Sequence, residues 1–70
     1  MAKAKIKRLY SIPILSKVLD VLELLEEISG PISLEEVFQR TRISKTSVYR
    51  ILKTLVHRGY LAQTQNGQYQ

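Results

Sequence analysis

Apolar residues recur at helical spacing soon after the start of the chain. One stripe consists of Leu15, Val18, Leu22 and Leu25. Their spacing places them on one face of a helix. Pro13 suits a first helical turn, where its missing N–H costs nothing. Gly30 followed by Pro31 ends a helix. The pattern therefore predicts a first helix that begins at about Pro13 and ends before Gly30.

The same helix carries a second apolar row, formed by Val21, Leu24 and Ile28. A small domain has difficulty burying two rows by itself, so this row is a candidate dimer contact. The alternative is that both rows belong to one wide core stripe. The sequence favours neither reading over the other.

A second, shorter helix is predicted after Pro31. Ser33 and Glu36 have the spacing of a capping box, in which Glu36 can reach back to the Ser33 N–H. The helix should end near Arg40 or Thr41. Its inward face is predicted to consist of Leu34, Val37 and Phe38.

A third helix follows after a turn of about three residues. Ser44 is its expected cap, Arg58 its last residue and Gly59 its stop signal. Its core side is predicted to consist of Val48, Ile51, Leu52, Leu55 and Val56. Two helices joined by so short a turn, the second longer and basic, indicate a helix-turn-helix.

Asn66-Gly67 lies between two short segments after the third helix. This dipeptide is a strong hairpin signal, because both residues tolerate the positive φ of a type I′ turn. Ile32 could add a short third strand. The expected fold class is therefore mainly α with a small β-hairpin, a three-helix winged helix-turn-helix in residues 13–70.

Charge is distributed unevenly along a chain with a net charge of +5. Residues 1–12 form a basic arm, expected to be flexible, with Lys3, Lys5, Lys7 and Arg8 and no acid. All acidic residues lie in residues 15–36, and residues 37–70 contain none. A surface this one-sided favours a polyanionic partner over a merely solvated basic face.

Several functional classes are disfavoured by composition. Cysteine is absent and there is one histidine, so neither a disulfide nor a metal site is expected. Paired carboxylates, a nucleophile with its base and a phosphate-binding glycine loop are also missing, so we expect no cofactor and no enzyme activity. Charges interrupt the most apolar region, so no membrane span is expected, and the protein should be cytoplasmic.

The outer side of the third helix carries the strongest functional signal. At about 100° per residue, Thr46, Arg50, Lys53 and His57 lie opposite the core, flanked by Ser47 and Tyr49. Short hydroxyl side chains and arginine near a helix N-terminus are typical of major-groove recognition. Lys45, in the first turn, could also bind phosphate there. The alternative is an ordinary solvated helix face, with Tyr49 as a packing residue.

The chain resembles the N-terminal winged helix-turn-helix of isocitrate-lyase-regulator (IclR-type) bacterial transcription factors. The likeness covers about residues 12–69, in "IPILSKVLDVLELL", "ISLEEVFQRTRISKTSVYRILKTLVHRGYL" and "NGQYQ". It implies repressors or activators that bind double-stranded operator DNA as dimers or tetramers. It also implies a small-molecule effector bound by a C-terminal domain, which this sequence does not contain.

The resemblance extends to individual positions. It places Lys17 near the DNA backbone, and on recognition-helix contacts it places Lys45, Thr46, Ser47, Tyr49 and Arg50. The full set of expected DNA contacts is Lys17, Arg42, Ser44, Lys45, Thr46, Ser47, Tyr49, Arg50 and Lys53. Two positions depart from the family pattern. Arg42 replaces a turn glycine, so either the turn avoids positive φ or it carries strain of about 1 kcal/mol. Phe38 replaces a small residue, which implies a repacked core.

A second function from another class remains open at this point. A winged helix can serve as a protein-interaction module, and here it would dock through the Val21, Leu24 and Ile28 row. Binding of a random duplex at low salt would separate this reading from DNA recognition.

Overall fold

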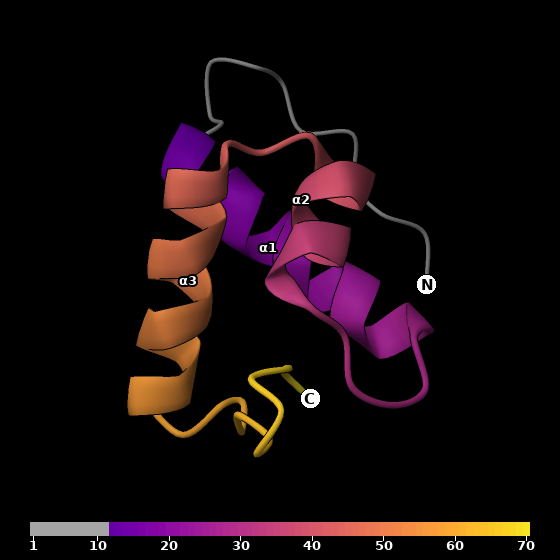
Figure 1. Cartoon of the computed structure of the whole chain (residues 1–70). Helices are drawn as coiled ribbons and strands as arrows, with labels where there is room; N and C mark the ends of the chain where they lie inside the picture. Colours follow the sequence, from indigo (N-terminus) through magenta and orange to yellow (C-terminus); the bar gives the residue numbers. More distant parts are fainter. Residues whose placement is uncertain (1–11) are drawn as a thin grey trace.

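The computed structural model describes residues 12–70. Within them lie three helices, α1 (Pro13–Glu27), α2 (Leu34–Thr41) and α3 (Lys45–His57). Helix α2 packs against both of the others, and α3 lies along one side of the molecule (Figure 1). Apart from Ile12, the basic arm expected in residues 1–12 lies outside the described residues. The three predicted helices are confirmed.

The start of α2 confirms half of the predicted capping box. The Ser33 Oγ accepts a hydrogen bond from the Glu36 N–H at 3.1 Å. The Glu36 carboxylate does not complete the box, because it pairs with the Arg40 Nε at 3.2 Å instead. An arginine one turn later competes for this carboxylate.

Both ends of α3 form as the sequence predicts. The Ser44 Oγ accepts a hydrogen bond from the Ser47 N–H at 3.2 Å. At the other end, Gly59 has a φ of +86° and its N–H bonds the Val56 carbonyl at 3.1 Å. The next N–H, that of Tyr60, bonds the Leu55 carbonyl at 2.8 Å. These two bonds define a Schellman motif, which a glycine at this position allows.

The hydrophobic core gathers side chains from every element and from the connecting segments. Its buried members are Val21, Ile32, Val37, Ile43, Val48, Ile51, Leu52, Leu55 and Tyr69. The predicted core side of α3 is confirmed, with Val56 partly buried against the cluster. Tyr69 is the unexpected member, since it comes from the C-terminal segment.

The two apolar rows of α1 differ in how deeply their residues are buried. Val21 is 0% exposed at the centre of the core, and Leu24 and Ile28 pack against it. This row therefore contributes to the core of the domain, and a dimer contact through α1 stays a prediction. Leu15, predicted to be a core residue, is 49% exposed, because the core is reached only by later turns of α1.

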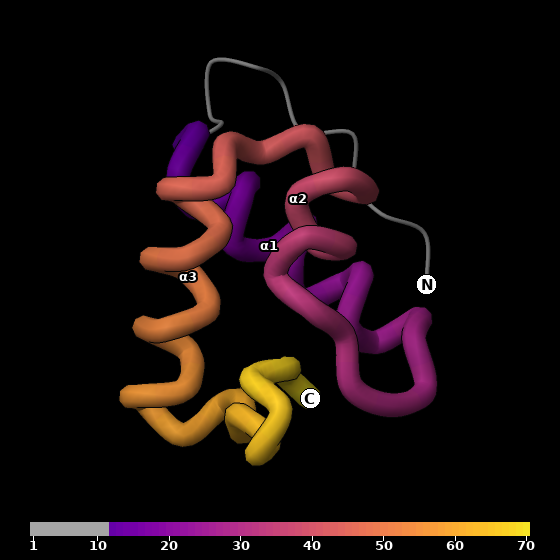
Figure 2. Tube along the Cα trace, viewed as in Figure 1, coloured from indigo at the N-terminus to yellow at the C-terminus, as the bar shows by residue number. Residues whose placement is uncertain are grey.

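The predicted hairpin is not seen as a pair of strands, since no strand forms within residues 12–70. Tyr69 makes isolated antiparallel bridges to Ile32 and to Gln63. Figure 2 shows the C-terminal segment, in yellow, folded back toward the loop between α1 and α2. The predicted pairing of Ile32 is present as one bridge.

The turn itself differs from the expected type I′. Gly67 has a φ of +82°, but Asn66 does not have a positive φ. The Gly67 N–H bonds the Thr64 carbonyl at 3.0 Å, and the Thr64 N–H bonds the Gln68 carbonyl at 2.8 Å. This is a three-residue connection with a left-handed glycine at its end. The turn therefore requires the positive φ of Gly67 but not a positive φ at Asn66.

Candidate nucleic-acid interface

The outward face of α3 is open to solvent along its whole length. We call Thr46, Arg50, Lys53 and His57 the outer stripe, and all four side chains are exposed. Tyr49 is exposed and Ser47 is half-buried at its two edges. Val48 and Leu52, on the opposite side of the helix, are completely buried. The predicted exposure of the outer stripe is therefore confirmed, and its contact with DNA stays a prediction.

The N-terminal end of α3 combines a hydroxyl cap with a paired lysine. The Ser44 Oγ lies 3.1 Å from the Ser47 Oγ, in addition to capping the helix. The Lys45 Nζ forms an ion pair with the Glu35 Oε2 at 2.6 Å. It also lies 5.3 Å from the centre of the Phe38 ring. Both partners come from α2, so this lysine connects the two helices of the helix-turn-helix.

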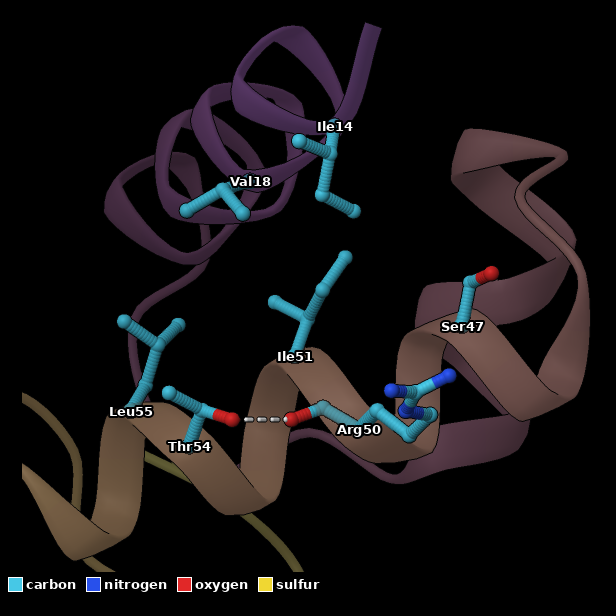
Figure 3. A pocket seen from close by; sticks show the side chains of 7 residues that line it. All are labelled: Ile14, Val18, Ser47, Arg50, Ile51, Thr54 and Leu55. Atoms are coloured by element: carbon cyan, nitrogen blue, oxygen red, sulfur yellow. Dashed lines mark hydrogen bonds between the residues drawn. The ribbon is translucent and has the colours of Figure 1, made fainter.

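Arg50 lies at the edge of a groove between α1 and α3. The groove has a volume of about 320 Å³, and its lining residues are Ile14, Val18, Ser47, Arg50, Ile51, Thr54 and Leu55. Ile14 and Val18 of α1 point toward Ile51 across it (Figure 3). The Arg50 carbonyl accepts a hydrogen bond from the Thr54 hydroxyl at 2.7 Å, drawn as a dashed line there. The groove is mainly apolar, which suits packing better than catalysis.

Lys53 connects α3 to the C-terminal segment. Its Nζ donates a hydrogen bond to the Gln63 Oε1 at 3.2 Å and lies 5.9 Å from the centre of the Tyr49 ring. Sequence reasoning missed both Gln63 and Glu35 as neighbours of the lysines. Neither could be found from helical periodicity, because each contact joins two different elements.

Arg42 occupies the turn between α2 and α3 with a φ of +62°. Of the two readings left open by the sequence, the strained one is correct. The Arg42 N–H bonds the Phe38 carbonyl at 3.0 Å, which ends α2. The next residue, Ile43, is buried in the core, and its N–H bonds the Thr41 hydroxyl at 3.3 Å. Packing of Ile43 thus fixes the left-handed conformation.

Charged side chains of opposite sign occupy different parts of the domain. Helix α3 contains no acidic residue, not even in its first turn, where helices often have one. A second hollow, between α1 and α2, is lined by Asp20, Glu23 and Glu27 together with Arg40. Lys17 is exposed on the part of α1 that contributes Ile14 and Val18 to the groove beside α3. The outer stripe is thus the cationic side available to an anion.

Other kinds of site find no support in the part of the chain that the structure describes. Residues 12–70 hold no group of three or more metal-ligating side chains. None of the helices there has the length and apolar character required to cross a bilayer.

Comparison with protein families gives one match, to the IclR helix-turn-helix domain, over residues 14–65. No curated protein and no solved structure matched at a significant level. The matched range contains α1 from its second residue onward, the whole of α2 and α3, and the outer stripe. Because this match covers most of the 70 residues, the chain belongs to the IclR helix-turn-helix family, a family of DNA-binding domains of transcription regulators.

Proposed function

We propose that this domain recognises a specific double-stranded operator sequence by inserting α3 into the major groove. The observation that carries the proposal is the outer stripe, a cationic and hydroxyl-bearing face that no other described element covers. The major groove of B-DNA is wide enough for one α-helix, and arginine reads guanine there through two parallel hydrogen bonds. Family membership supports DNA as the partner.

Each residue of the interface has a proposed role. Arg50 reads a base edge, and Thr46 and Ser47 allow close approach beside it. Lys45, Tyr49 and Lys53 contact phosphates on either side of the helix. Further phosphate contacts come from Lys17, Arg42 and Ser44.

The proposed regulator works as an assembly of such domains. One recognition helix covers one half-site, so two domains would bind half-sites about 34 Å apart or a multiple of it. We place dimer or tetramer formation, and binding of a small-molecule effector, in a C-terminal domain outside this sequence. The proposed location is the bacterial cytoplasm, where operator DNA lies.

Selection of binding sites from a randomised duplex library tests the role of α3. The wild-type domain should enrich one sequence, and Arg50→Ala should lose the preference at one or two base pairs. The loss at one base pair should amount to about 1–3 kcal/mol. Arg58→Ala is the matched control, since it removes the same charge at the far end of α3. If Arg50→Ala selected the same sequence as wild type with the same preference at every base pair, Arg50 would not be a base-reading residue.

A second candidate function, protein docking through α1, is favoured by one observation. Ile12, Ile14, Leu15 and Leu19 are large apolar residues that remain exposed on or beside α1. Exposed apolar patches often mark protein contacts. Failure of the domain to bind any duplex at low salt would favour this candidate over DNA recognition.

A further inference from the structure

Lys45 is bound on two sides by α2, although it is the first residue of α3. The Glu35 carboxylate lies 2.6 Å from its Nζ, and the Phe38 ring centre lies 5.3 Å from the same atom. The lysine and Glu35 side chains are 54% and 57% exposed, so both are open to an approaching ligand. The sequence alone gives no sign of this pairing, because both partners belong to a different helix.

The ion pair reduces the net positive charge that a DNA phosphate encounters at this end of α3. An unpaired ammonium releases a counterion when it binds a phosphate, and this release dominates non-specific affinity. A lysine paired with a carboxylate at 2.6 Å presents almost no net charge. A phosphate must therefore either displace Glu35 or accept a neutral pair, and both outcomes weaken the contact.

Glu35 is well placed to exert this effect. It lies in the first turn of α2, where the helix dipole stabilises a carboxylate. The neighbouring acid, Glu36, is already engaged with Arg40 of its own helix. The Phe38 ring adds a second attraction that holds the ammonium on the α2 side. Together the two α2 residues compete with DNA for one cation.

We infer that Glu35 restrains the non-specific DNA affinity of this domain by sequestering Lys45. The inference rests on the proposed DNA-binding function and adds to it a residue that tunes the affinity for DNA. A complex with random DNA depends on phosphate contacts almost entirely, whereas a complex with the correct operator also gains base contacts. Weakening one phosphate contact therefore lowers the affinity for random DNA directly, while the operator complex loses the same free energy and is still held by its base contacts.

The test measures fluorescence anisotropy of a labelled random-sequence duplex at a series of salt concentrations. Glu35→Gln should bind about 1.5- to fivefold more tightly than wild type, the range expected when one exposed ion pair is removed. The slope of log affinity against log salt should steepen by up to about 0.9, because one more cation becomes available. Glu26→Gln is the control, since it removes the same charge from an exposed residue of α1.

Lys45→Ala and the double variant with Glu35→Gln complete a cycle. If Glu35 acts through Lys45, Glu35→Gln has no effect on affinity once Lys45 is alanine. An equal gain in the presence and absence of Lys45, or an equal gain from Glu26→Gln, would overturn the inference in favour of general repulsion. Unchanged affinity of Glu35→Gln would also overturn it. Absence of any binding by wild type would instead contradict the proposed function, so the two failures are distinguishable.

Discussion

At the scale of single residues, Arg42 carries the clearest stored strain. Its φ of +62° is a conformation that glycine adopts freely and that costs other residues about 1 kcal/mol. Arg42→Gly should therefore stabilise the domain slightly, by up to about 0.6 kcal/mol after the greater freedom of glycine in the unfolded chain is counted. The midpoint of urea unfolding measures this change. A midpoint that falls would mean that the arginine side chain stabilises the turn by more than the strain costs.

A glycine control and DNA binding refine this test. Arg40→Gly places the same substitution inside α2, where it should destabilise the domain by up to about 1 kcal/mol. Arg42→Gly should also weaken binding to random duplex, if Arg42 is a phosphate contact. The sequence leaves the sign of φ at Arg42 open, because this conformation depends on the burial of Ile43 in a core made by distant residues.

At the scale of elements, a structural role and a proposed DNA contact fall on one residue at the N-terminus of α3, Ser44. The Ser44 Oγ caps the helix at Ser47, and Ser44 is exposed beside the outer stripe. Ser44→Ala should lower the free energy of unfolding by about 1 kcal/mol. Ser44→Asp should keep the cap, because aspartate is an equally good cap, while its charge repels phosphate. Urea unfolding and duplex binding, measured on both variants, separate the two roles.

The expected result is a crossed pattern. Ser44→Asp should have wild-type stability and weak duplex binding, while Ser44→Ala should lose stability with a smaller effect on binding of the folded domain. Equal DNA affinity of wild type and Ser44→Asp would place the DNA away from the start of α3.

Helix ends were predictable here because caps are local. Ser33, Ser44 and Gly59 each act on backbone groups within a few residues, so the sequence determines where α2 begins and where α3 begins and ends. The inward face of α1 was harder to predict from the sequence. Its rows are both apolar, and which of them is buried depends on packing against α2 and the shared core, which covers Val21 and does not reach Leu15. Tyr69 entered the core for the same non-local reason.

At the scale of the whole molecule, charge separates into two sides. Glu23 and Glu27 line the hollow between α1 and α2, whereas α3 has cations and no acid. The sequence already indicated this separation, because residues 37–70 contain no acid. It could not show that Glu35 would cross to α3 and pair with Lys45. Linear charge patterns predict which face meets a polyanion, but individual pairings depend on how helices cross.

This polarity makes Lys17 a test of how the domain sits on DNA. If α1 lies beside the backbone while α3 fills the groove, Lys17→Ala should weaken binding to every sequence and reduce the salt slope by about 0.9. Arg40→Ala is a matched loss of one cation from the acidic side, where Arg40 is paired with Glu36 and lines the acidic hollow, and it should leave the slope unchanged. Anisotropy titrations of a random duplex over a range of salt concentrations measure both slopes. Equal slopes for Lys17→Ala and wild type would mean that α1 does not reach the DNA, and that the phosphate contacts come from α3 and the turn before it.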